Sequence, residues 1–166
     1  MALSLFKMNL ILKAYGLFKI PLIAFVGPKL VELTDSKSVV KIGLGFRTKN
    51  HLGVMYFGAL AIGAELSIAL KAVEAIQLSG KRIDFLFKDF KIEFLKRADG
   101  DVHFTCEEAG LVRDLILKSV NSNERFEQKF SGYAVVPSKS NEPVIKYELT
   151  LSIKNRSRPK ESLSNS

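Results

Sequence analysis

The sequence predicts one α+β domain in which a mostly antiparallel sheet of about six strands wraps around a long central helix, with an extra amino-terminal helix. Three observations predict this fold. The segment 57–78 has helical periodicity, and its first half, FGALAIGAELSIAL, is apolar on nearly every face, so we expect it to be buried on most sides. About six other segments alternate apolar and polar residues, as half-buried strands do. The 166 residues, 47% apolar and 25% charged, suit a single globular domain.

The remaining elements follow in chain order. Apolar residues at three- and four-residue steps predict a helix over 4–19, and the prolines and glycine of 21–28 predict an irregular segment after it. Alternation predicts strands over 29–33, 39–47, 83–94, 102–106, 125–136 and 144–154, and a second helix is expected over 109–120. The alternation changes phase at Lys88-Asp89, which predicts a β-bulge. Asp99-Gly100 predicts a hairpin turn before the strand at 102.

We divide the chain into an amino-terminal helical extension (1–27), a main domain (28–155) and a flexible basic tail (156–166). The net charge of +8 is concentrated at the ends, with +6 in residues 1–49 and +3 in residues 154–166. A positive field favours anionic partners such as phosphate-bearing ligands, acidic lipids or RNA. The central region has almost no net charge, so a nucleic-acid partner is not favoured. A membrane surface stays a weak alternative because the lysines of the first helix form no dense cluster.

Several classes of protein are excluded or disfavoured. The single cysteine, Cys106, rules out an intrachain disulfide, and two histidines with one cysteine make a structural zinc site unexpected. Lys7, Lys13 and Lys19 interrupt the apolar stretch 3–26, so neither a membrane span nor a secretory signal is expected, and a cytoplasmic protein is the simplest interpretation. A sheet that covers one side of a buried helix leaves an edge and a face exposed, which predicts a homodimer or a dimer of dimers.

Glu65 is the main candidate for chemistry. It is the one charged residue in the apolar stretch from Val54 to Leu70, where an unpaired carboxylate is costly. Gly58, seven residues earlier, lies on the same helix face, near the free N–H groups of the helix start. Such groups can stabilise an oxyanion, and a nearby carboxylate can activate water or attack directly, which suits acyl hydrolysis. The alternative is a structural carboxylate with a buried partner, within the subunit or across a dimer interface.

The segment NHLGVMYFGALAIGAE (50–65) resembles the signature of hotdog-fold acyl-CoA thioesterases, in particular the phenylacetate-pathway branch. In that signature an Asn and a Gly precede His-Gly-Gly at a helix start, and an acid follows nine residues after the His. Here Asn50 and Gly53 match the first two, and Glu65 matches the acid. Tyr56, Phe57 and Gly58 stand at the positions of His-Gly-Gly. The segment LKRADGDV (95–102) also resembles the family's hairpin after the third strand, and the order of elements fits this fold over residues 28–155.

The resemblance implies hydrolysis of an acyl thioester, with coenzyme A present only as part of the substrate and no other cofactor. It implies that Glu65 is the general base or nucleophile and that the amides near Phe57 and Gly58 form the oxyanion hole. Asn50 would orient the water or the acid. In the family the acid of one subunit works with the helix start of the other. The bulky Phe57 departs from the pattern and narrows the approach to the helix start, and Asn50 also suits a plain turn residue.

Four further residues are candidates for substrate binding. Tyr56 stands at the helix start, and His51 could reach the site from its loop, although a solvent-facing histidine is the alternative. Lys96 and Arg97 suit the phosphates of coenzyme A, although a solvated charge pair in the hairpin is the favoured alternative. The predicted function is therefore acyl thioester hydrolysis. The alternative is a non-catalytic hotdog protein that binds an acyl chain or lipid.

Overall fold

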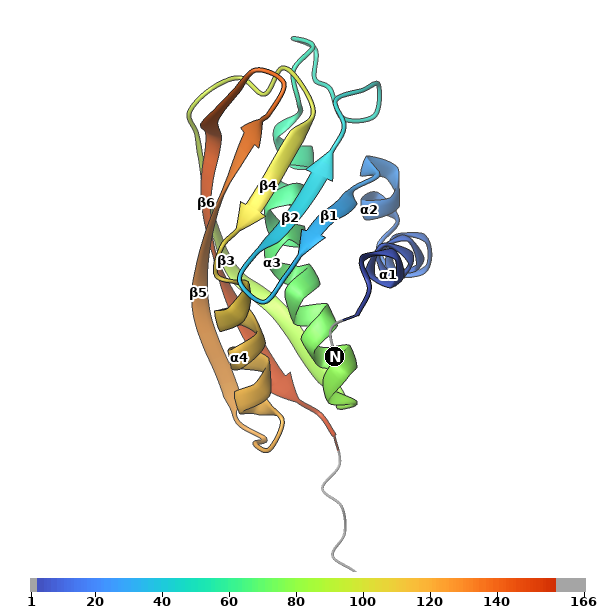
Figure 1. The fold of residues 1–166 in the computed structure, drawn as a ribbon, viewed down its shortest axis with the longest axis vertical. Helices are drawn as coiled ribbons and strands as arrows, with labels where there is room; N and C mark the ends of the chain where they lie inside the picture. Colours follow the sequence, from blue (N-terminus) through green and yellow to red (C-terminus); the bar gives the residue numbers. More distant parts are fainter. Residues whose placement is uncertain (1–2, 158–166) are drawn as a thin grey trace, which may run out of the picture.

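The structure, a computed structural model, describes residues 3–157. The described residues form four helices and six strands (Figure 1), in the order α1 (Leu5–Phe18), α2 (Pro21–Val26), β1 (Lys29–Leu33), β2 (Ser38–Ile42), α3 (Phe57–Ser79), β3 (Ile83–Phe94), β4 (Val102–Cys106), α4 (Ala109–Ser119), β5 (Arg125–Val136) and β6 (Ser140–Asn155). The predicted α+β class is confirmed. The predicted flexible tail, 156–166, lies outside the described residues from 158 onward.

One antiparallel sheet carries the fold. Its strand order is β1-β2-β4-β5-β6-β3, so β1 and β3 are the two edges. The sheet curves around α3, which lies against its inner face, and α4 packs beside α3 near one end of β5 (Figure 1). The phase change predicted at Lys88-Asp89 is confirmed as a register shift between Phe87 and Phe90, where β3 pairs with β6. The bulge keeps Phe85, Phe87 and Phe90 on one face of β3, where they line the same space as residues of α3.

The long helix α3 is buried as its composition predicted. Ala64, Ile68 and Ala72 belong to the main core cluster shared with the strands. Gly63 packs so closely against the ring of Phe104 on β4 that a methyl group there would overlap it. Ser67 is fully buried, and its hydroxyl lies 2.8 Å from the phenolic oxygen of Tyr147 on β6. The same Tyr147 hydroxyl donates to the Thr105 carbonyl at 3.1 Å, so a buried polar link joins α3, β4 and β6.

The amino-terminal helices cover the β1 edge of the sheet. The expected first helix is confirmed as α1, but the irregular segment expected after it is wrong, because Pro21–Val26 forms the short helix α2. Proline at the first position of a helix loses no hydrogen bond, which explains why Pro21 begins α2. The Asn9 side chain bonds both the N–H and the carbonyl of Leu30, at 2.9 and 2.8 Å. This amide therefore occupies the backbone groups that β1 would otherwise leave open at its edge.

Two strand boundaries differ from those expected. The strand predicted over 39–47 ends at Ile42, because side chains replace the neighbouring strand as partners: Asp101 accepts from Leu44 N at 3.0 Å, and Thr48 Oγ1 accepts from Gly45 N at 2.9 Å. The last strand begins at Ser140, earlier than the expected 144, because Ser140 pairs with Val136 across a tight turn. Both differences arise from contacts between residues that local alternation does not report.

The hairpin expected at Asp99-Gly100 is wrong. Strand β3 pairs with β6, and β4 lies between β2 and β5, so residues 95–101 cross the end of the sheet from an edge strand to an interior one. A short polar loop is compatible with either connection, and only the pairing partners of β3 and β4 distinguish them.

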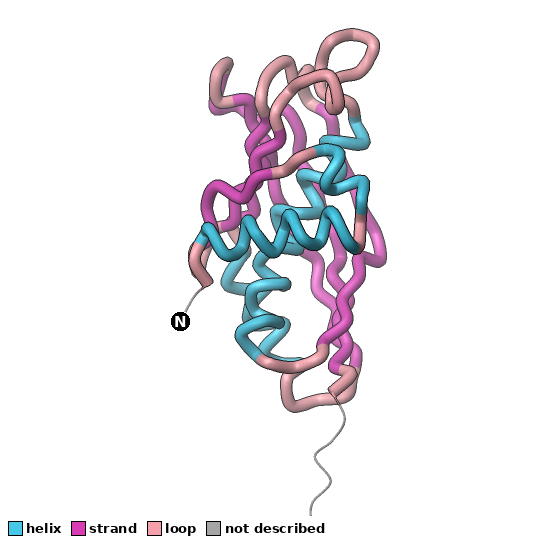
Figure 2. Tube along the Cα trace, turned by 90° about the vertical axis from the view of Figure 1, so that its right-hand side faces the viewer, coloured by secondary structure: helices cyan, strands magenta, loops and turns pink. Residues whose placement is uncertain are grey.

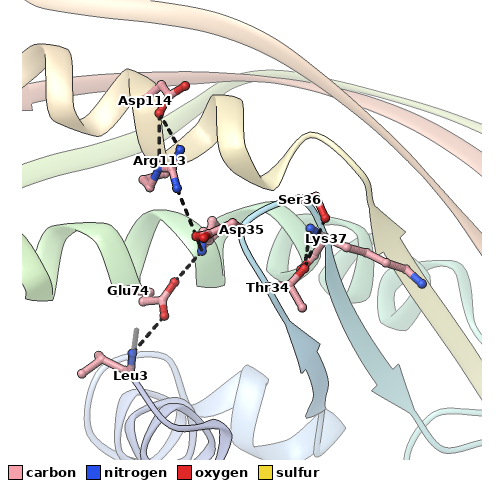
Figure 3. A network of polar contacts seen from close by, with 9 residues as sticks. Leu3, Thr34, Asp35, Ser36, Lys37, Glu74, Arg113 and Asp114 are labelled. Carbon is pink, nitrogen blue, oxygen red and sulfur yellow. Dashed lines mark hydrogen bonds and ion pairs between the residues drawn. The ribbon is translucent and has the colours of Figure 1, made fainter. Parts of the chain in front are cut away.

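A buried ion pair lies on the carboxyl-terminal half of α3. Lys71 and Glu74 have side chains only 3% and 2% exposed, and they are 2.8 Å apart. Figure 3 shows the polar contacts around them. Glu74 also accepts from Leu3 N at 3.1 Å, and Lys71 lies 3.7 Å from Asp35, which Arg113 of α4 contacts at 3.0 Å. The cluster thus joins the start of α1, the turn between β1 and β2, α3 and α4.

Candidate functional site

A large apolar cavity lies between α3, the edge strand β3 and the two amino-terminal helices. Its volume is about 730 Å³. Three groups of residues line it: from α1, α2 and the turn between them, Ile11, Leu12, Tyr15, Ile20 and Ile23; from α3, Ala61, Ile62, Glu65, Leu66, Ala69, Leu70, Val73, Ile76 and Gln77; and from β3 and β6, Ile83, Asp84, Phe85, Leu86, Phe87, Phe90 and Leu149. Figure 2 shows α1 running across α3. Ile11, Leu12 and Tyr15 of α1 form one wall of the cavity.

Glu65 is the carboxylate on the long α3 wall of the cavity. Its side chain is partly buried, and that burial raises its pKa above the ordinary value of 4.5. Burial is the sole cause of this shift, so within residues 3–157 no hydrogen bond or neighbouring charge offsets it. A carboxylate in this state is a stronger base than a fully solvated one, and it has lone pairs free for a water molecule or a substrate.

The start of α3 presents backbone N–H groups. The first intrahelical bond runs from Leu60 N to Tyr56 O at 3.1 Å, so the amides of Phe57, Gly58 and Ala59 precede it. The helix has no side-chain cap at this end. The rings of Tyr56 and Phe57 are 4.8 Å apart and about half exposed. The Tyr56 ring lies against Gly58, where a methyl group would overlap it. The bulk that the sequence places at Phe57 therefore lies at the helix start itself.

A second hollow, of about 340 Å³, adjoins this helix start. It brings together six of the eight predicted site residues, Asn50, His51, Tyr56, Phe57, Lys96 and Arg97, with Gly58 next in the chain. Glu65 lines the larger cavity instead. Since α3 rises about 1.5 Å per residue, Glu65 lies about 12 Å along the helix from Phe57. The two spaces follow each other between α3 and β3, because β3 runs back along α3 and its last residue, Phe94, reaches the helix start.

Asn50 organises its own loop. Its side-chain oxygen accepts from Leu52 N at 2.9 Å and from Val54 N at 3.3 Å, as the turn interpretation of this residue requires. The turn passes through Gly53, whose φ of 77° favours glycine. These two bonds use only the side-chain oxygen of Asn50, and the side chain also lines the second hollow.

The basic residues of the second hollow have different surroundings. Lys96 forms an exposed ion pair with Glu142, and Lys96 in turn lowers the pKa of Glu142. His51 and Arg97 are exposed and line the rim. An exposed ion pair contributes little to stability, so a phosphate could displace Glu142 from Lys96 at small cost.

Sequence reasoning missed the contribution of the amino-terminal helices. The sequence assigns no role to the extension 1–27, yet five of its residues line the Glu65 cavity. The apolar residues of that extension were a signal of burial, but the sequence does not say which part of the domain they meet. Another hollow, of about 650 Å³, is polar and lined by residues such as Lys91, Glu107 and Lys146. Within residues 3–157, no group of three His, Cys, Asp or Glu side chains is arranged to hold a metal ion.

Comparisons with known proteins place the chain in a family. The model of the family described as "Domain of unknown function (DUF4442)" matches residues 9–152. A search of curated proteins finds no match. Among solved structures, a candidate thioesterase from Shewanella oneidensis superposes with a TM-score of 0.75 at 15% identity, covering 92% of this chain and 99% of that chain.

Two further structures agree. A protein of unknown function from Chlorobaculum tepidum has a TM-score of 0.77 at 12% identity, covering 92% of this chain and 98% of that chain. A thioesterase from Haemophilus influenzae has a TM-score of 0.66 at 14% identity, covering 93% of each chain. At these identities the likeness shows the fold, which is the hotdog fold. With its family model matched over most of its length, the chain belongs to the DUF4442 family and is a hotdog protein.

Proposed function

We propose that this protein hydrolyses an acyl thioester, with an acyl conjugate of coenzyme A as the substrate. The observation that carries the proposal is Glu65, a carboxylate with a pKa raised by burial on the wall of an apolar cavity of about 730 Å³. An acyl chain suits that cavity, because its transfer from water is favourable and needs no hydrogen bonds.

In the proposed reaction Glu65 acts as general base. It removes a proton from a water molecule, whose oxygen attacks the thioester carbonyl carbon, and the N–H groups at an α3 start stabilise the oxyanion. The C–S bond then breaks, and the thiolate of coenzyme A leaves and takes up the proton. The products are a carboxylic acid and a free thiol. Direct attack by the carboxylate, followed by hydrolysis of the anhydride, gives the same products.

The proposed active unit is a homodimer in which the acid of one subunit works with the helix start of its partner. Two features support it. Glu65 and the α3 amides of one chain are about 12 Å apart along the helix, which is too far for one reacting group. Strand β3 is a free edge of 12 residues with exposed apolar side chains at Leu86, Phe90 and Phe94, and such edges favour pairing. Light scattering tests the dimer through the molar mass.

His51, Lys96 and Arg97 are proposed to bind the phosphates of coenzyme A from the rim of the second hollow. Tyr56 would border the entrance, and Asn50 would orient water or the acid through its amide nitrogen. The cytoplasmic location expected from the sequence also stays a prediction.

The second candidate function is binding of an acyl chain or lipid without catalysis. The ring of Phe57 favours it, because it packs against Tyr56 at the helix start, where the thioesterase signature has a glycine. A carrier needs the cavity but not access to the α3 amides.

The test measures thiol release from short, medium and long acyl-CoA esters by wild type, Glu65→Gln and the exposed control Glu124→Gln. The proposal expects turnover in wild type and in the control, and its loss in Glu65→Gln with the fold retained. Binding of fatty acid without thiol release by wild type would establish the carrier function instead. Turnover that survives in Glu65→Gln would remove Glu65 from the mechanism.

A further inference from the structure

The outward surface of the amino-terminal helices is apolar and basic. Met8, Leu12 and Ile23 belong to one buried cluster, so α1 and α2 each direct one side toward β1, β2 and α3. The opposite sides expose large apolar residues. Their exposed fractions are 81% for Phe6, 58% for Leu10, 66% for Leu17, 81% for Phe18, 60% for Leu22 and 53% for Phe25. We call these six residues the amino-terminal patch.

The patch on α1 is a stripe bordered by lysines. At about 100° per residue, Phe6, Leu10 and Leu17 fall within about 40° of one another, nearly opposite the buried Met8 and Leu12. Lys13 lies on one side of this stripe and Lys7 on the other, and both are exposed. Soluble monomeric proteins seldom expose adjoining apolar side chains of this size without a partner.

The charge of this surface identifies the partner. Residues 1–31 contain four lysines and no acid. The guanidinium of Arg47, in the loop after β2, lies 5.9 Å from the ring centre of Phe25 on α2 and adds a cation beside the apolar residues. A second copy of the chain would bring the same positive charges together, whereas an anionic lipid surface offers both an apolar layer and negative headgroups.

We propose that α1 and α2 dock the protein on an anionic lipid surface. The 14 residues of α1 span about 21 Å, so the helix would lie in the plane of the interface, with Phe6, Leu10 and Leu17 among the acyl chains. Lys7 and Lys13 on either side would reach the headgroups, as long basic side chains do. Within residues 3–157, no helix is long and apolar enough to cross a membrane.

Docking would place the Glu65 cavity close to the lipid. The inner sides of the same helices line that cavity through Ile11, Leu12 and Ile23, so one helix diameter, about 10 Å, separates it from the docked surface. A ligand with a long acyl chain could then enter from the membrane. The docking itself does not depend on the hydrolysis proposed above.

The experiment measures co-sedimentation of the full chain with vesicles of equal parts phosphatidylglycerol and phosphatidylcholine, and with vesicles of phosphatidylcholine alone. We expect stronger binding to the anionic vesicles, weakened by salt, and a loss of about fivefold for each of Lys7→Gln and Lys13→Gln. The double variant Leu10→Glu/Leu17→Glu should lose at least about tenfold. Both leucines are exposed and neither lines the cavity, so the folding and the ligand binding of this double variant should not change.

The matched control is Leu111→Glu/Leu117→Glu, whose leucines are 48% and 53% exposed. Both lie on α4, which is across α3 from α1 (Figure 1). This variant should bind anionic vesicles as wild type does. Equal loss in both double variants would overturn the proposal, as would a wild-type protein that stays in the supernatant with anionic vesicles. If wild type does not bind vesicles and Leu10→Glu/Leu17→Glu halves its molar mass, the patch is a contact between copies of the chain and the lipid proposal is wrong.

Discussion

Glu65 and Glu74 are two glutamates of the same helix in contrasting surroundings. They are nine residues apart, so they project from nearly opposite faces of α3, about 14 Å apart along it. Glu74 is the more deeply buried, yet Lys71 and Leu3 N satisfy both of its oxygens. Glu65 is less buried, but burial raises its pKa without a partner to offset the shift. Depth of burial alone therefore does not distinguish the two carboxylates, and the role proposed for Glu65 rests instead on burial without compensation beside a cavity.

The comparison predicts that replacing Glu65 lowers activity, whereas disturbing the Glu74 ion pair lowers stability. Glu65→Gln should lower kcat for the preferred acyl-CoA by about 10²–10⁴-fold, the usual contribution of a general base. Its urea midpoint should not fall, since no described partner is lost. Thiol release and urea unfolding of the same preparation measure both. A Glu65→Gln protein that has lost stability along with activity would instead make Glu65 a structural residue like Glu74.

The buried pair gives the largest expected effect on stability. Lys71→Ala leaves the Glu74 carboxylate buried with its cation removed, and we expect it to lower the free energy of unfolding by about 3–5 kcal/mol. The double variant Lys71→Met/Glu74→Leu should recover most of that loss, because it removes both charges and keeps apolar volume. Denaturant unfolding of wild type and both variants checks this. Equal stability of the single and double variants would show that Lys71 is not the group that compensates the buried charge of Glu74.

The raised pKa of Glu65 predicts a dependence on pH. For a carboxylate whose folded pKa lies above its unfolded value, the contribution to stability is full below the unfolded value and declines as the pH rises through the folded pKa. Glu65→Gln should therefore match wild type near pH 4 and unfold at higher urea at pH 8. The acid limb of kcat/KM in wild type should lie above the ordinary glutamate value of 4.5. If wild type and Glu65→Gln have the same stability at both pH values, the pKa of Glu65 is not raised in the folded protein.

The exposed end of the Glu74 cluster should matter least. Asp35 is 80% exposed, although it contacts both Lys71 and Arg113. Solvent screens such pairs, so Asp35→Asn should change the free energy of unfolding by less than about 1 kcal/mol. Unfolding in low and high salt measures it. A cost near that of Lys71→Ala would mean that Asp35, and not Glu74 alone, holds the buried lysine.

Several features could be predicted from local patterns. The apolar run from Phe57 determined the buried helix, and the phase change at Lys88-Asp89 determined the bulge in β3, because both depend on neighbours in the chain. The candidate residues around Asn50 and Tyr56 could also be identified, because they lie close together in one segment.

The features that the sequence did not predict depend on contacts between distant segments of the chain. The sequence placed charge at Lys71 and Glu74 but did not reveal that both are buried, because their partners Asp35 and Leu3 lie far away in the chain. It likewise suggested a hairpin where the chain crosses between strands that do not pair.

The sequence by itself determined the kind of fold, the long buried helix and the unusual acid at Glu65, since periodicity and composition act over a few residues. Only the tertiary structure decided that α1 and α2 form a wall of the Glu65 cavity and that Glu74 is the compensated acid. It also placed Glu65 and the α3 start in two adjoining spaces. The physical reason is that burial, pairing and pKa depend on which distant segments meet, and strand order and helix packing set those meetings.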